Sequence, residues 1–179
     1  MEKLFLSYNQ IHETVKEIAG KINADGYTFD FMIAIGTGGF IPARMLKTFI
    51  NRPIVTVGMA YYDLDDNQMD APVINQWLDD PINQIKGRKI LLVDEVDDTR
   101  STIGFCLERL LRHDPMEIAV AVLHNKNKPK SREIPAGVKR YYSGLELEDR
   151  WICYPWDADD IWEQDRQAVW SDPPEKGKK

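Results

Sequence analysis

Apolar positions follow two periods along this chain, and each period predicts a different kind of element. Between Tyr8 and Ala24 they recur at helical spacing, which predicts an amphipathic helix packed on a larger body: Ile11, Val15, Ile18, Ala19 and Ile22. Short, mainly apolar segments at 31–35, 54–60, 90–93 and 117–123 predict strands, of which 90–93 is expected to be buried on both faces. Helices are predicted at 43–50, opened by Pro42, and at 103–112. This alternation predicts an α/β fold with a central, mostly parallel, twisted sheet flanked by helices.

The remaining segments set the expected organisation of the chain. Residues 61–84 are polar, acidic and irregular, and they are predicted to form a long functional loop. The length of 179 residues fits one domain, expected over 1–171. The tail at 172–179 is rich in proline and lysine and is predicted to be disordered.

Composition narrows the class of protein. The net charge of −6 argues against a nucleic-acid binder, although a local basic pocket for one phosphorylated substrate remains open. Cys106 and Cys153 form no C-x-x-C pair, so free thiols in a reducing cytoplasm are expected. Cys106 is interpreted as a packing residue. No apolar run reaches the length of a membrane span, and no membrane partner is expected.

The segment from Ile90 to Thr102 carries the strongest chemical signal. A buried strand ends in Asp94 and Glu95, and a hydroxyl-rich turn then leads into a helix. Backbone N–H groups and the helix dipole attract a phosphate, to which Thr99, Ser101 and Thr102 can donate hydrogen bonds. The two acids offer hard oxygen ligands that suit Mg²⁺ or sugar hydroxyls. The plainer alternative is a buried strand capped by solvated acids.

This segment resembles the phosphoribosyl-diphosphate-binding motif of the type I phosphoribosyltransferases. The turn at Gly36-Thr37-Gly38-Gly39 could form an anion nest or only a tight strand–helix connection. Beside the first motif it resembles the diphosphate loop of that family, which can carry a cis peptide, here Gly36–Thr37. The resemblance implies that phosphoribosyl diphosphate is bound by Thr37, Gly38, Gly39, Asp94, Glu95, Asp98, Thr99, Arg100, Ser101 and Thr102.

Two further segments resemble the 6-oxopurine branch of the family. In purine-specific members a lysine at the exit of a strand binds the exocyclic oxygen, which implies Lys126 here, with Lys128 as its rival. The segment 149–157 resembles the base-binding hood of bacterial xanthine-guanine enzymes. Trp151 would stack on the base, and the backbone of Ile152 would contact its edge. Asp157 would hold a second Mg²⁺ or else cap a helix near residue 158.

The hood and the polar loop carry further expectations. Trp156 is expected in the core. Residues 61–63 and 66–68 resemble a mobile loop that folds over the reacting centre, with a disordered acidic loop as the alternative. Together with the N-terminal segment, the C-terminal segment is expected to form a small hood. The order of motifs is most similar to fungal-type hypoxanthine-guanine enzymes.

The activity implied by the resemblance is transfer of phosphoribosyl to N9 of hypoxanthine, guanine or xanthine, with release of pyrophosphate. Asp98 would be the catalytic general base, and Mg²⁺ the cofactor, held by Asp94, Glu95 and Asp157. Subunits would pair into a homodimer or homotetramer. The alternatives are a non-catalytic phosphoribosyl-diphosphate sensor and a transferase for another base. Two residues depart from the family pattern: Arg100 stands where glycine is usual, and Asp97 where an aliphatic residue is frequent.

Overall fold

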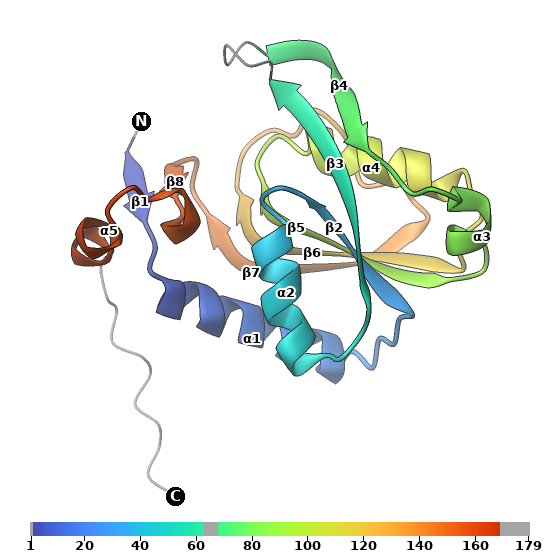
Figure 1. Cartoon of the computed structure of the whole chain (residues 1–179), viewed down its shortest axis with the longest axis horizontal. Helices are drawn as coiled ribbons and strands as arrows, with labels where there is room; N and C mark the ends of the chain where they lie inside the picture. Colours follow the sequence, from blue (N-terminus) through green and yellow to red (C-terminus); the bar gives the residue numbers. More distant parts are fainter. Residues whose placement is uncertain (1, 63–67, 169–179) are drawn as a thin grey trace, which may run out of the picture.

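A six-stranded sheet forms the centre of the protein in the computed structural model, which describes residues 2–62 and 68–168 (Figure 1). The strand order is β4-β3-β2-β5-β6-β7, and the pairs are parallel except for the antiparallel edge pair β3–β4. The strands are β2 (Phe31–Gly36), β3 (Ile54–Tyr62), β4 (Gln68–Gln76), β5 (Lys89–Asp97), β6 (Glu117–Lys126) and β7 (Val138–Leu147). The predicted α/β fold with a mostly parallel sheet is confirmed.

Helices cover both faces of the sheet because its central strands are apolar on both sides. On β5, Leu91 and Val93 pack towards α1 (Tyr8–Ala24) and α2 (Phe40–Phe49), whereas Ile90 and Leu92 pack towards α3 (Pro81–Ile85) and α4 (Ser101–Leu111). Alternate residues of a strand point to opposite faces, so a continuous apolar run feeds two cores. The predicted bounds of α1 are confirmed, and α2 and α4 each begin two or three residues earlier than predicted.

Segments from both ends of the chain form a small hood at one side of the sheet (Figure 1). Strand β1 (Lys3–Phe5) pairs in parallel with β8 (Trp151–Cys153), followed by the short helix η1 (Pro155–Asp157) and by α5 (Ile161–Gln167). The buried amide of Gln164 donates to the backbone oxygens of Leu6 and Cys153 and so joins α5 to both terminal segments. The expected hood is therefore present.

The predicted loop at 61–84 is wrong. Strand β3 continues to Tyr62, β4 occupies Gln68–Gln76, and α3 follows. In β4, Val73 is exposed while Ile74 packs against the core, so this edge strand needs apolar residues on one side only and shows no apolar run. Residues 63–67, which include part of the expected mobile loop, lie outside the described residues, as does the tail at 172–179.

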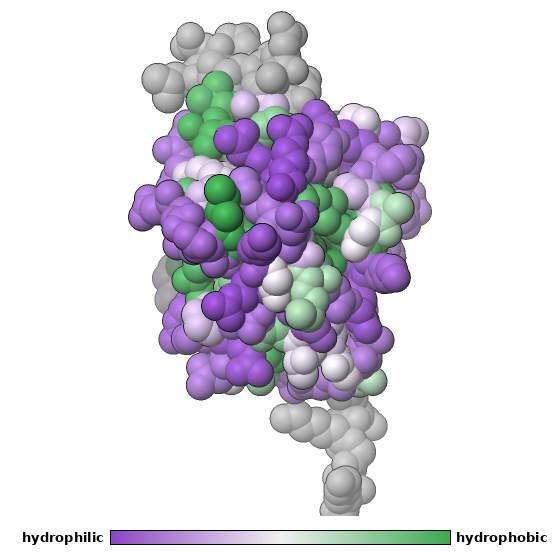
Figure 2. Space-filling model, turned by 90° about the vertical axis from the view of Figure 1, so that its right-hand side faces the viewer, coloured by the Kyte–Doolittle hydropathy of each residue, from purple (hydrophilic) through white to green (hydrophobic). Residues whose placement is uncertain are grey.

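The view of the surface in Figure 2 shows polar residues separating small apolar areas. Among the residues that the structure describes, no helix is both long and apolar enough to cross a bilayer. Cys106 lies on the face of α4 that packs into the core, and it is fully buried there. Burial raises the pKa of its thiol. Its interpretation as a packing residue is confirmed.

Candidate active site

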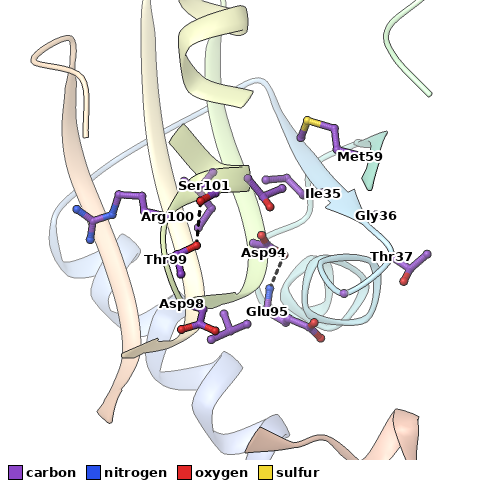
Figure 3. A pocket seen from close by; sticks show the side chains of 14 residues that line it. Ile35, Gly36, Thr37, Met59, Asp94, Glu95, Asp98, Thr99, Arg100 and Ser101 are labelled. Carbon is purple, nitrogen blue, oxygen red and sulfur yellow. Dashed lines mark hydrogen bonds between the residues drawn. The ribbon is translucent and has the colours of Figure 1, made fainter. Parts of the chain in front are cut away.

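A cavity of about 350 Å³ opens at the carboxyl ends of β2 and β5 (Figure 3). Ligands bind at this edge in open α/β sheets, because the loops after neighbouring strands converge there. Residues from the ends of β2 and β5, from β3, from the glycine turn and from the start of α4 line it: Ile35, Gly36, Thr37, Gly38, Met59, Asp94, Glu95, Val96, Asp98, Thr99, Arg100, Ser101, Thr102 and Ile103. Nine of the ten residues expected to bind phosphoribosyl diphosphate are thus brought together around one cavity.

Gly39 is the tenth, and it lies beneath the turn rather than in the cavity wall. Its amide donates to the carbonyl of Ile35 at 2.8 Å, and a Cβ on it would come within 2.5 Å of the carbonyl oxygen of Val93. Gly39 therefore lets the turn pack closely on the sheet, a role that only a residue without a side chain can fill. The Gly36–Thr37 peptide bond is cis, as the resemblance implied.

Glu95 rests against Gly38, so the glycine turn and the acids are in direct contact. A Cβ on Gly38 would lie 2.2 Å from the Cδ atom of Glu95. Burial, and then the nearby Asp157 carboxylate, raise the pKa of Glu95 to about 7, against a hydrogen bond from Trp156 Nε1 at 3.1 Å. Burial also raises the pKa of Asp94, and the Glu95 carboxylate adds to the effect. A cation bound beside these two buried carboxylates would stabilise their charged forms, so the site is suited to a cation.

The turn between β5 and α4 is held by hydroxyl groups. Thr99 Oγ1 lies 2.9 Å from Ser101 Oγ, which lies 2.7 Å from Ser131 Oγ. The Ser131 amide donates to the Thr99 carbonyl at 2.9 Å. Ser101 and Thr102 belong to the first turn of α4, where backbone N–H groups lack partners within the helix. This arrangement can bind a phosphate with both amides and hydroxyls.

The two departures from the family pattern, Asp97 and Arg100, contact each other. Arg100 adopts a left-handed conformation with φ 64°, and its Nε donates to Asp97 Oδ2 at 2.8 Å. Asp97 is 0% exposed and does not line the cavity. It therefore does not share the cavity with Asp98, which does line it.

Asp98 lines the cavity and is part of a cluster of four charges. Its carboxylate lies 3.2 Å from Lys126 Nζ and 3.0 Å from Lys128 Nζ. Asp149 closes the cluster, at 3.5 Å from Lys126 and 3.0 Å from Lys128. The hydrogen bonds that Lys128 donates to Asp149, and then to Asp98, raise the pKa of Lys128. Both candidate lysines reach Asp98, so the choice between Lys126 and Lys128 stays open.

The hood residues line a different cavity. Trp151, Ile152 and Asp157 belong to a second hollow of about 460 Å³, and the Trp151 side chain is 60% exposed. Asp157 nevertheless acts on the central cavity, because its charge raises the pKa of Glu95 there. Its predicted alternative role as a helix cap falls to Asp160, whose side chain accepts from Trp162 and Glu163 at the start of α5.

Several residues around the site do not follow from the sequence. Trp156 packs against the core as expected, but it also holds Glu95. Asp149 was predicted only as the first residue of the hood segment, and Lys130, Ser131 and Tyr141 were not predicted at all. The lysine-rich segment after β6 offers a signal for Lys130 and Ser131, whereas nothing in the sequence connects Tyr141 with Asp97, 44 positions away.

Fold and site together define a class: an α/β protein with a cavity at the strand ends, lined by a glycine turn, acids and hydroxyl groups, that can bind a phosphorylated ligand. A family model for the phosphoribosyl transferase domain matches residues 7–158. This chain belongs to that family.

Relatives with assigned activities match over most of their length. The chain is 37% identical to xanthine phosphoribosyltransferase 1 of Saccharomyces cerevisiae, covering 89% of this chain and 92% of that protein. It is also 37% identical to the hypoxanthine-guanine phosphoribosyltransferase of Schizosaccharomyces pombe, over 93% and 95%. Among solved structures, a hypothetical protein of Neisseria gonorrhoeae with bound ppGpp is 48% identical, with a TM-score of 0.86 over 93% of this chain and 96% of that one.

Proposed function

We propose that this chain is a purine phosphoribosyltransferase, which joins phosphoribosyl diphosphate to N9 of a 6-oxopurine and releases pyrophosphate. The pairing of Asp98 with Lys126 and Lys128 carries the proposal. A 6-oxopurine presents an acceptor, O6, beside N7, which donates in one tautomer. An ammonium group next to a carboxylate is complementary to that edge. Adenine would present an amino donor to the ammonium group instead, and this mismatch argues against it.

Phosphoribosyl diphosphate would lie along the central cavity. Its 5′-phosphate fits the amides and hydroxyls of residues 98–102, and its diphosphate fits the turn at Thr37 and Gly38. The ribose hydroxyls then come opposite Asp94 and Glu95. Binding in this way fixes the reacting carbon near the incoming base, so that much of the entropic cost of the reaction is met by binding.

The acids fit a Mg²⁺ ion that is held in part by substrate. Among the described residues, no cluster of three or more histidine, cysteine or acidic groups forms a complete metal cage. Mg²⁺ usually keeps several waters and binds through one or two carboxylates together with phosphate oxygens. Asp94 and Glu95 would supply those carboxylates, with Asp157 at the second position. The ion would neutralise the diphosphate and so make it a better leaving group.

Asp98 is the proposed general base. Its side chain is 43% exposed, and two lysines hold it at the mouth of the cavity. When a purine binds, one lysine can donate a hydrogen bond to O6 in place of Asp98, while Asp98 accepts the proton of N7. Trp151 and the backbone of Ile152 are the proposed base-stacking and edge-reading groups, which requires the hood to move over the central cavity.

A direct assay tests the proposal. The protein is incubated with Mg²⁺, phosphoribosyl diphosphate and one base at a time: hypoxanthine, guanine, xanthine, adenine, uracil or orotate. Nucleotide and pyrophosphate in equal amounts with one or more of the first three are expected. Nucleotide from uracil or orotate alone would contradict the assignment to purines.

A second candidate is a non-catalytic sensor of phosphorylated ribosyl compounds. The bound ppGpp of the Neisseria gonorrhoeae protein favours it, because that nucleotide combines a purine with ribose phosphates. Titration calorimetry with ppGpp and with phosphoribosyl diphosphate, singly and in competition, measures both affinities. Tight, competitive binding of ppGpp without turnover on any base would support the sensor over the enzyme.

The proposed setting is the cytoplasm, where free thiols are stable. Cys106 and Cys153 are both unpaired in the structure, which supports this setting. The homodimer or homotetramer implied by the family resemblance stays a prediction, which sedimentation analysis would test.

A further inference from the structure

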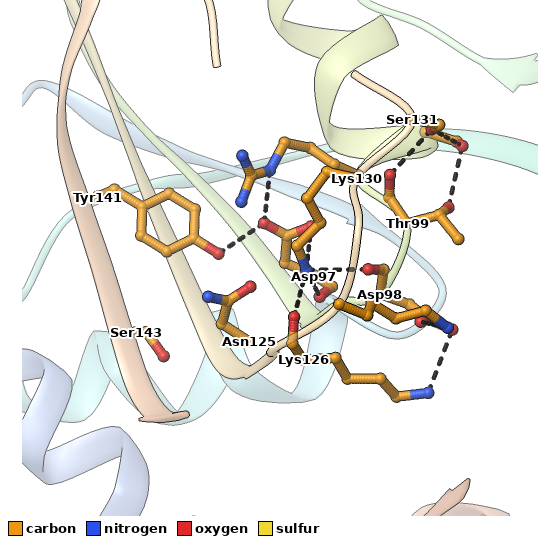
Figure 4. Close-up of polar contacts among 12 residues, drawn as sticks. Asp97, Asp98, Thr99, Asn125, Lys126, Lys130, Ser131, Tyr141 and Ser143 are labelled. Carbon is orange, nitrogen blue, oxygen red and sulfur yellow. Dashed lines mark hydrogen bonds and ion pairs between the residues drawn. The ribbon is translucent and has the colours of Figure 1, made fainter. Parts of the chain in front are cut away.

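Lys130 holds together two strand ends that carry different parts of the site. Its side chain is 12% exposed, and its ammonium group donates to the backbone oxygens of Asp97 at 2.7 Å, Asp98 at 2.9 Å and Lys126 at 2.8 Å (Figure 4). An ammonium group has three protons to donate, and all three are used on backbone acceptors. The β5–β6 ladder ends at the pair Asp97–Asn125, so Lys130 continues the connection beyond it.

Asp97 supplies the negative charge that this buried lysine requires. Its Oδ1 lies 3.5 Å from Lys130 Nζ, while Oδ2 accepts from Arg100 Nε at 2.8 Å and from the Tyr141 hydroxyl at 2.7 Å. A fully buried carboxylate is strongly unfavourable unless it is paired and hydrogen-bonded. The four residues Asp97, Arg100, Lys130 and Tyr141, named here the Asp97 network, thus connect β5, the turn, the segment after β6, and β7.

Arg100 links the Asp97 network to the turn between β5 and α4, named here the phosphate turn. A left-handed conformation is unfavourable for any residue with a side chain other than asparagine or aspartate. Its guanidinium is held by Asp97 and lies 5.7 Å from the centre of the Tyr141 ring. These contacts favour the conformation that turns Thr99 and Ser101 towards each other at the mouth of α4.

We propose that Lys130 and Tyr141 are positioning residues, which act through Asp97 and Arg100 to fix the phosphate turn and its spacing from Lys126. This inference rests on the proposed function for the identity of the phosphate, a ribose 5-phosphate ester. Neither residue touches the cavity, so their effect on substrate is indirect.

Tyr141→Phe is the central test, because the chain offers a matched control. Tyr142, the next residue, also donates its hydroxyl to a carboxylate, that of Asp25 at 2.6 Å, but away from the site. Each substitution to Phe removes one hydroxyl from β7. Tyr141→Phe is expected to raise the KM for phosphoribosyl diphosphate by roughly five- to tenfold, less than the full cost of a lost hydrogen bond to a charged group, because Tyr141 acts on the substrate indirectly. Tyr142→Phe is expected to leave that KM unchanged.

Lys130 is tested with a conservative pair. Lys130→Met keeps the apolar stem and removes the ammonium group, whereas Lys130→Arg keeps the charge and the donors. The Met variant is expected to raise the KM for phosphoribosyl diphosphate by roughly tenfold or more, and the Arg variant to recover part of that loss. If Lys130→Met fails to fold, Tyr141→Phe decides. Equal KM values in folded Tyr141→Phe and wild type, or equal effects of Tyr141→Phe and Tyr142→Phe, would overturn the proposal.

A binding measurement separates this proposal from the proposed function. Ribose 5-phosphate is titrated into wild type, Tyr141→Phe and Tyr142→Phe. If wild type makes no nucleotide but binds ribose 5-phosphate more tightly than Tyr141→Phe does, the transferase assignment fails and the positioning role stands. If wild type turns over but Tyr141→Phe binds ribose 5-phosphate with unchanged affinity, the transferase assignment stands and the positioning role fails. Absence of ribose 5-phosphate binding by wild type contradicts the positioning role.

Discussion

The proposed phosphate side of the site, around Asp97, and its proposed base side, around Asp98, are built from the same residue types in opposite ways. On the phosphate side, Asp97 is fully buried and its partners come from three segments. On the base side, Asp98 and Asp149 are 43% and 37% exposed and share Lys128 and the more deeply buried Lys126, which is 7% exposed. A carboxylate that stays partly in contact with solvent loses little when it exchanges one cation for another partner, whereas a fully buried charge tolerates no loss of its partners. The phosphate side is thus preorganised, and the base side is arranged to change partners.

Asp98 joins the two sides, and removing its charge is expected to have the largest effect. Asp98→Asn should lower kcat by roughly 10²- to 10⁴-fold, the usual contribution of a general base, with little change in affinity for phosphoribosyl diphosphate. Steady-state kinetics with both substrates varied measures this. An unchanged kcat would remove Asp98 from the role of general base.

Removing one of the two lysines that contact Asp98 is expected to have the next largest effect. If Lys126 binds O6, Lys126→Met should lower kcat/KM for hypoxanthine by roughly ten- to a hundredfold, since a hydrogen bond from a charged donor is lost. Lys128→Met is its matched control, because both ammonium groups lie within 3.2 Å of Asp98. A larger loss in the Lys128 variant would assign the base contact to Lys128 instead.

Gly38 tests how closely the phosphate side is packed. In Gly38→Ala the new methyl group would lie within 2.2 to 2.7 Å of the Glu95 carboxyl atoms, so Glu95 must move. We expect the KM for phosphoribosyl diphosphate to rise by about tenfold, for the loss of one well-placed charged contact. Gly20→Ala on α1 is the control: apart from the neighbouring backbone of its own helix, no atom lies within 4 Å of its added Cβ, and the helix gains stability. Equal KM values in the two variants would show that Glu95 is not fixed by this contact.

The hood is anchored by a buried pair whose predicted effect is on stability and not on substrate binding. His124 Nδ1 lies 2.8 Å from the Tyr154 hydroxyl, and burial lowers the pKa of His124 to about 4. Unfolded histidine has a pKa near 6.5. Between these values the unfolded chain binds the extra proton, so the stabilisation by neutral His124 is complete above about pH 6.5 and declines as the pH falls towards 4.

The measurement compares the unfolding free energies of wild type and His124→Asn. Glu95, whose pKa is raised, titrates in the opposite sense over part of the same range, and the comparison cancels it. The advantage of wild type should decrease by up to about 1.4 kcal/mol per pH unit below pH 6.5. A difference that does not change with pH would mean that His124 is not held neutral by the fold.

Much of the site followed from local sequence. The strand at 90–93, the acids that follow it and the hydroxyl turn occupy consecutive positions, so one segment predicted one half of the cavity. The glycine turn was equally local. The error at 61–84 arose because an edge strand lacks the apolar run that marks a central one. The missed Tyr141 and the missed link between Trp156 and Glu95 depend on contacts between distant segments.

The sequence by itself determined the periodic elements, the class of fold and the chemistry at the end of β5, because each depends on the order of neighbouring residues. Only the tertiary structure decided that the two unusual residues Asp97 and Arg100 are partners, that Lys130 connects both sides of the site, and that Asp98 faces two lysines. Such pairings depend on which strands are adjacent in the sheet. That adjacency is set by packing of the whole core rather than by any single segment.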